Sequence, residues 1–131
     1  MTRNASNLQI DSARLWDTIH ETAKFGHTPK GGVRRLTLSQ EDKQVRDWFR
    51  QQCEAVGCTV TVDEVGNMFA RRPGRDESLP PICVGSHLDT QPTGGKFDGI
   101  LGVLSGLELL RTLHDTGYET NAPIEVINWT N

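Results

Sequence analysis

The feature that most constrains the fold is a pair of short apolar runs separated by one long apolar helix. The first run, Ile82–Ser86, has the apolar character of a strand buried on both faces, and residues 124–129 are expected to form another buried strand. Between them, apolar residues recur at helical spacing at Ile100, Val103, Leu104, Leu107 and Leu110. Gly117 follows where such a helix would end. A strand, a helix and a strand at this spacing predict a βαβ unit with parallel strands, and therefore an α/β fold.

The first half of the chain predicts two helices and a hairpin that flank this unit. Apolar residues at helical spacing favour a first helix within residues 8–25. A second helix is expected after Ser39, a favourable N-cap residue, with its apolar face ending at residue 56. The period then changes to alternation, which predicts a strand over residues 58–63 and a returning strand over residues 68–71.

Composition and charge exclude several classes of function. The net charge of −3 gives no basic field for nucleic acid and no polybasic patch for a membrane surface. No apolar run approaches the ~20 residues that span a bilayer, and residues 1–11 lack the apolar core of a signal peptide. We therefore expect a cytoplasmic protein. Its three cysteines, Cys53, Cys58 and Cys83, fit no metal-ligand spacing and are expected to be small buried thiols.

The side chains best suited to chemistry lie just beyond the first apolar run. His87 and Asp89 follow it directly, and Asp98 lies at the start of the apolar helix. Ligands of open α/β sheets bind beyond the carboxyl ends of the strands, and Gly94-Gly95 would let the loop return so that Asp98 comes beside His87. Imidazole and carboxylate suit zinc-like ions, and Asp89 could hold the second ring N–H of His87. Spacing alone also permits a loop histidine and a helix N-cap aspartate.

Two other motifs have structural interpretations. Gly99, Gly102 and Gly106 are expected to allow close packing of the helix on the sheet rather than to form a dinucleotide site. Arg34 and Arg35 could meet an anionic substrate group, but we expect a solvated pair.

Three stretches together carry a family resemblance. They are residues 31–36 with Ser39, residues 63–69 followed by 71–74, and residues 85–90 with 94–103. In this order they are similar to motifs of the M20-type metallohydrolases, and within them of the N-carbamoyl amino acid hydrolases, β-ureidopropionases and allantoate amidohydrolases. The likeness covers nearly the whole chain.

The resemblance implies a role for each candidate residue. His87 would be a ligand of one metal ion, Asp98 would bridge two ions, and Asp89 would be the catalytic-site partner that orients His87. The two divalent ions would be zinc or manganese, and cobalt or nickel would also suit the ligands. The peptide bond between Asp98 and Gly99 would be cis, a geometry that glycine would ease.

The implied activity is hydrolysis of a linear ureido amide by water that two metal ions activate. The substrate would be an N-carbamoyl amino acid, N-carbamoyl-β-alanine or allantoate. The alternatives are an M20 exopeptidase or N-acyl amino acid deacylase, a non-catalytic binding module of the same fold, and a plain α/β domain with a loop histidine.

The same resemblance implies that the chain is incomplete. Residues 1–131 would be the N-terminal portion of a zinc-peptidase-like catalytic domain. The general base, the remaining metal ligands and a lid or dimerisation domain would lie outside them. The parent protein would be a homodimer that binds a small-molecule substrate, and the 131-residue piece by itself would be inactive.

Overall fold

A mixed sheet organises the computed structural model, which describes residues 8–131. Its strands are β1 (Thr59–Val62), β2 (Met68–Arg72), β3 (Ile82–Ser86) and β4 (Ile124–Asn128), in the spatial order β1-β2-β4-β3. β2 runs antiparallel to both β1 and β4, whereas β3 and β4 are parallel. The predicted parallel βαβ unit is therefore confirmed. Residues 1–7, part of the segment in which we expected no signal peptide, lie outside the described residues.

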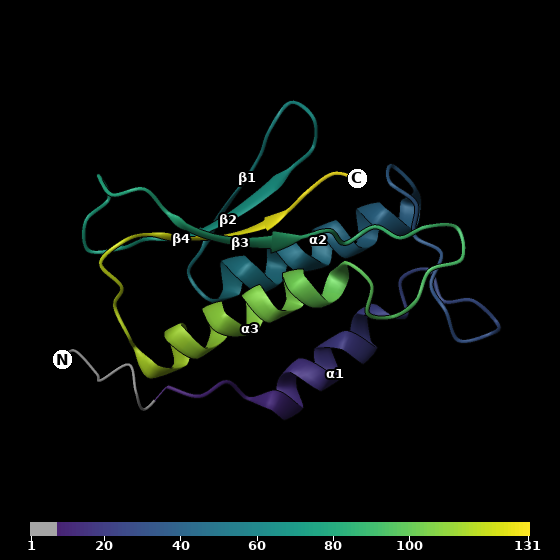
Figure 1. Ribbon diagram of the computed structural model, residues 1–131, viewed down its shortest axis with the longest axis horizontal. Helices are drawn as coiled ribbons and strands as arrows, with labels where there is room; N and C mark the ends of the chain where they lie inside the picture. The colour runs from purple at the N-terminus through teal and green to yellow at the C-terminus, as the bar shows by residue number, and fades with distance from the viewer. Residues whose placement is uncertain (1–7) are drawn as a thin grey trace.

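Helices cover one face of this sheet. α2 (Gln40–Ala55) packs against β1, and α3 (Ile100–Thr116) packs against β3 and β4. α1 (Ser12–Thr22) packs on α3, on the side away from the strands (Figure 1). Within residues 8–131, none of the helices has the length and apolar character needed to cross a membrane.

The ends of the helices follow from local sequence signals. Ser39 is the N-cap of α2, and its hydroxyl accepts a hydrogen bond from the main-chain N–H of Asp42. Gly117 takes a left-handed conformation (φ 63°) after α3, as predicted. The first helix begins later than the expected residue 8, because Asp11 caps it by accepting a hydrogen bond from the N–H of Arg14.

β3 is an edge strand, and our prediction that it is buried on both faces is wrong. Within the described sheet it pairs with β4 alone, and Ile82 is 61% exposed. Cys83 in the same strand is also exposed, contrary to the expected buried thiol. Cys53 and Cys58 are buried as predicted, and burial raises the pKa of both thiols. An apolar run signals a strand but does not reveal whether a neighbour covers it.

Two glycines bring α3 close to the sheet. A Cβ atom on Gly106 would lie 2.6 Å from Val126 Cγ1, and one on Gly102 would lie 2.7 Å from Ser86 Cβ. These distances are too short for real carbon–carbon contacts, so side chains at these positions would push the helix outward. The predicted close helix–sheet packing is therefore confirmed. It brings the first turn of α3 beside the end of β3.

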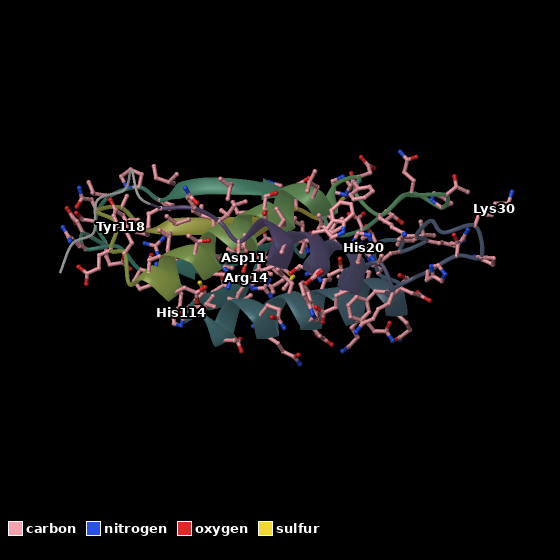
Figure 2. All side chains as sticks on the ribbon, turned by 90° about the horizontal axis from the view of Figure 1, so that it is seen from below. Asp11, Arg14, His20, Lys30, His114 and Tyr118 are labelled. Atoms are coloured by element: carbon pink, nitrogen blue, oxygen red, sulfur yellow. The ribbon has the colours of Figure 1, made fainter. Side chains whose placement is uncertain are left out.

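A partly buried ion pair joins α1 to α3. Glu108 of α3 is 1% exposed, and its carboxylate accepts hydrogen bonds from the guanidinium of Arg14, at 2.7 Å from Nη2 and 2.9 Å from Nε. The main-chain N–H of Asp11 donates to the same carboxylate at 3.1 Å. Figure 2 shows Asp11 and Arg14 at the seam between the two helices. The hydrogen bond to Glu108 is the main cause that raises the pKa of Arg14.

Candidate metal centre

The candidate residues lie in one loop at the carboxyl end of β3. This loop, residues 87–98, is called the polar loop below, and it connects β3 to α3. It stands where open α/β sheets bind their ligands. His87 begins it and is half-buried, Asp89 is buried, and Asp98 is exposed just before the helix.

The imidazole of His87 is held by Asp89 through one ring nitrogen. Nδ1 lies 2.8 Å from the main-chain oxygen of Asp89 and 3.2 Å from its carboxylate Oδ1. The carbonyl makes the hydrogen bond, while Oδ1 contributes an electrostatic contact without hydrogen-bond geometry. A proton on Nδ1 leaves a lone pair on Nε2, and no side chain or main-chain group in residues 8–131 bonds to Nε2. This tautomer presents Nε2 as a ligand atom.

The His87 ring packs against Gly99, the residue that follows Asp98. The backbone of Gly99 has φ 75° and ψ −59°, and the N–H of Ile100 donates to the carbonyl of Asp98 at 2.9 Å. This is a γ-turn with positive φ, a conformation that strains any residue other than glycine. A Cβ atom on Gly99 would collide with the imidazole of His87. The expected cis peptide bond is wrong, because the peptide bonds of the described residues are trans and the positive φ makes the tight turn instead.

The available donor atoms fit part of a metal centre. Asp98 has an exposed carboxylate that bonds to no other group in residues 8–131, and His87, whose ring lies against Gly99, offers Nε2. Imidazole nitrogen and carboxylate oxygen together suit zinc and manganese. Across the described residues, no group of three or more potential ligand side chains comes together. His87 and Asp98 could therefore supply at most two ligands of such a centre, and the described residues do not complete it.

An early segment of the chain lies along the polar loop. This segment, residues 33–37, is called the clamp segment. Val33 and Gly94 exchange both main-chain hydrogen bonds, at 2.9 and 3.0 Å. The N–H of Thr90 donates to the carbonyl of Arg35 at 2.7 Å, and the hydroxyl of Thr90 accepts from the N–H of Arg35 at the same distance. Thr37 donates through its hydroxyl to Asp89 Oδ2. Only the family motif at residues 31–36 gave a sequence signal that this segment matters.

Arg35 is buried beneath the polar loop, so the expected solvated pair is wrong for this residue. It is 1% exposed, whereas Arg34 is exposed. Its Nε donates to the carbonyl of Leu88 at 2.8 Å, and Nη1 donates to the carbonyls of Phe25 and Thr22 at 2.6 and 3.2 Å. Burial lowers the pKa of Arg35 to about 10. Main-chain carbonyls therefore accept the hydrogen bonds of the Arg35 guanidinium, where the sequence led us to expect water.

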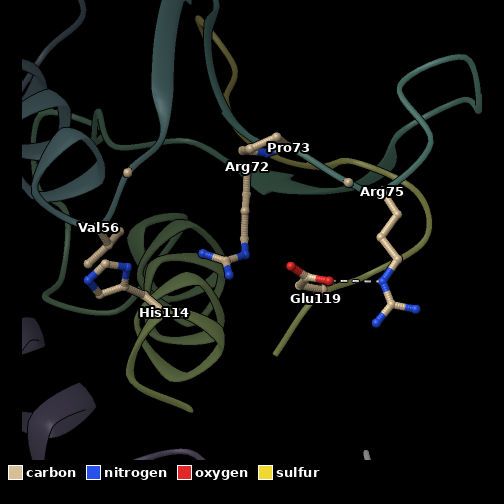
Figure 3. Close-up of a pocket in the computed structure, with 8 residues that line it drawn as sticks. Val56, Arg72, Pro73, Arg75, His114 and Glu119 are labelled. Atoms are coloured by element: carbon tan, nitrogen blue, oxygen red, sulfur yellow. Dashed lines mark hydrogen bonds and ion pairs between the residues drawn. The ribbon is translucent and has the colours of Figure 1, made fainter. Parts of the chain in front are cut away.

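A separate hollow of about 300 Å³ lies near the other end of α3, between Arg72, His114 and Glu119 (Figure 3). Arg75 forms an ion pair with Glu119 at 3.0 Å, and Arg72 donates to the carbonyl of Tyr118 at 3.1 Å. These contacts tie the end of β2 and the connection after it to the residues that follow α3. Of the motif at residues 71–74, Arg72 takes part in them.

The sheet, its helical face and the polar loop define an α/β domain with its polar side chains at the carboxyl end of a strand. Comparison with known proteins confirms both the fold class and the family resemblance. The chain is 50% identical to an N-carbamoyl-L-amino-acid amidohydrolase of Rhizobium meliloti over 131 residues, which is all of this chain and 32% of the relative. It is 33% identical to a ureidoglycolate hydrolase of Arabidopsis thaliana, covering 96% of this chain and 26% of the relative.

Solved structures with the same fold carry names related to those of these relatives. A hydantoinase/carbamoylase family amidase from Burkholderia ambifaria superposes with a TM-score of 0.93 at 56% identity, covering 95% of this chain and 31% of that one. No protein-family model matches the chain. Nearly all of this chain therefore aligns with these proteins, but it spans only about a third of their length.

Proposed function

We propose that the longer protein containing this chain is a metal-dependent amidohydrolase that cleaves a linear ureido amide. The substrate class is an N-carbamoyl amino acid or a related ureido acid such as N-carbamoyl-β-alanine, allantoate or ureidoglycolate. The names of the relatives support the reaction class. The observation that carries the metal dependence is His87, whose Nδ1 is held by Asp89 while its ring lies against the residue that follows Asp98.

Each residue of the polar loop has a defined part in this proposal. His87 Nε2 would ligate one divalent ion, and the carboxylate of Asp98 would bridge two. Asp89 would keep the proton of His87 on Nδ1, so that the lone pair stays on Nε2. When bound, zinc or manganese ions would lower the pKa of water and polarise the substrate carbonyl. Hydrolysis of an N-carbamoyl group would yield ammonia, carbon dioxide and the amino acid.

The test is ammonia release by the full-length protein. It would be loaded with zinc or manganese and offered an N-carbamoyl-α-amino acid, N-carbamoyl-β-alanine, allantoate and ureidoglycolate in turn. Asp98→Asn should reduce turnover by more than about 100-fold. Loss of a group that only supports a metal ligand costs up to about 100-fold, and loss of a ligand itself should cost more. Asp76→Asn is the control, because Asp76 is exposed and bonds locally to Ser78.

Two outcomes would redirect the proposal. Metal binding without ammonia from any ureido substrate would favour an M20 exopeptidase or deacylase. Equal turnover by Asp98→Asn and the unmodified protein would reject a role for Asp98.

We also propose that the parent protein is a cytoplasmic homodimer and that residues 1–131 form the N-terminal portion of its catalytic domain. The family resemblance supports both statements. Light scattering of the full-length protein during gel filtration would measure the subunit number, and a monomer would contradict the dimer.

A further inference from the structure

Thr37 makes a side-chain contact to the candidate centre from far away in the sequence. It lies in the clamp segment, 52 residues before Asp89, and its hydroxyl donates to Asp89 Oδ2. Asp89 is only 6% exposed. Because little water reaches this carboxylate, the loss of the Thr37 donor could not readily be replaced by solvent.

The two oxygens of the Asp89 carboxylate face different partners. Oδ2 faces Thr37, while Oδ1 lies 3.2 Å from His87 Nδ1 and has no hydrogen bond to any group in residues 8–131. A carboxylate is planar, so a donor that fixes one oxygen also fixes the direction of the other. The orientation of Oδ1 toward His87 therefore depends on the hydroxyl of Thr37.

The same hydroxyl has a second neighbour, the main-chain carbonyl of Asn131 at 2.7 Å. A hydroxyl carries one proton, so Thr37 can donate to only one of these oxygens at a time. Asp89 is 6% exposed and depends on this donor, whereas Asn131 is exposed and can bond to water instead. The proton of Thr37 is therefore directed to Asp89.

We propose that Thr37 is a positioning residue of the metal centre. Its hydroxyl anchors the side chain of Asp89, the residue whose main-chain carbonyl accepts the Nδ1 hydrogen bond of His87 and whose Oδ1 lies 3.2 Å from Nδ1. This inference rests on the proposed metal-dependent function. Supporting groups of this kind, one contact beyond the ligands, tune metal affinity because they fix the orientation and protonation of the ligand.

The experiment measures zinc affinity of the full-length protein and three variants after removal of metal with a chelator. Thr37→Val keeps the branched shape and loses the hydroxyl, whereas Thr37→Ser keeps the hydroxyl. Thr116→Val is the matched control, because the Thr116 hydroxyl also lies near two acceptors, the carbonyls of Thr112 at 2.8 Å and Leu113 at 3.4 Å, but in the last turn of α3. Zinc is titrated in competition with a chromophoric chelator, and thermal unfolding is recorded for each metal-free variant.

Thr37→Val is expected to weaken zinc binding by about 10-fold or more, the usual effect of losing a group that supports a ligand. Thr37→Ser and Thr116→Val should bind zinc like the unmodified protein. Equal zinc affinity in Thr37→Val and the unmodified protein would overturn the inference alone. Equal weakening in Thr37→Ser and Thr37→Val would also overturn it, because the hydroxyl would then not be the cause. An unmodified protein that binds no zinc would overturn the proposed function and the inference with it.

Discussion

At the scale of single residues, the position of the His87 imidazole depends on Gly99. Its positive φ of 75° makes the turn before α3, and the absent side chain leaves room for the imidazole. Gly95 lies in the same loop but has no atom within 4 Å of an added Cβ and no positive φ. The local geometry therefore requires glycine at position 99, whereas position 95 has space for a side chain.

We predict that Gly99→Ala displaces His87 and weakens metal binding by about 10-fold or more, as for other losses of ligand support. The strained backbone should also lower the free energy of unfolding by about 1–2 kcal/mol. Gly95→Ala should leave both quantities nearly unchanged. Metal titration and urea unfolding of the two variants provide the check, and equal behaviour of the two would contradict the packing of His87 on Gly99.

Residue chemistry and position in the chain were enough to predict His87, Asp89 and Asp98 as the candidate site. Arg35 and Thr37 could not be recognised in this way. Arg35 follows another arginine and resembles a surface residue, and the carbonyl groups that bury it come from other parts of the chain. Such long-range contacts leave no periodic signal in the sequence.

At the scale of elements, α1 is attached to α3 by the ion pair between Arg14 and Glu108. The pair differs from the exposed pair of Lys43 and Asp47 within α2, because Glu108 is buried. Loss of Arg14 would leave a buried carboxylate without its charged partner, whereas loss of Lys43 would leave Asp47 in water.

We predict that Arg14→Met lowers the free energy of unfolding by about 2–3 kcal/mol, below the usual range for buried pairs because Arg14 itself is partly exposed. Lys43→Met should change it by less than about 0.5 kcal/mol. Adding Glu108→Gln to Arg14→Met should recover part of the loss, because the buried charge is then removed. Urea unfolding measures all three, and no recovery would show that the charge of Glu108 is not the cause.

Element ends were predictable where the signal is local, as at Ser39 and Gly117. The exposure of β3 was not, because burial of a strand depends on what pairs with its edge. The apolar run at Ile82–Ser86 predicts the strand correctly but carries no information about its neighbour.

At the scale of the whole molecule, β3 is an edge strand of the described sheet that exposes apolar side chains. Ile82 and Val84 are exposed on it, and unpaired edge strands are templates for pairing with other chains. We predict that the 131-residue chain expressed by itself self-associates and that Ile82→Lys reduces the effect. Thr61→Lys, on exposed β1, is the control. Static light scattering measures the association, and equal association of the two variants would contradict a role for the β3 edge.

Metal binding by His87 and Asp98 is tested most directly by the metal content of the full-length protein. Metal-free protein would be equilibrated with zinc, freed of excess ions and measured by atomic emission. We predict about two ions per chain in the unmodified protein, as in two-metal hydrolases. His87→Ala and Asp98→Ala should each bind fewer, while His114→Ala, an exposed histidine at the other end of α3, should match the unmodified protein. Undiminished zinc content in both His87→Ala and Asp98→Ala would contradict metal binding by these two residues.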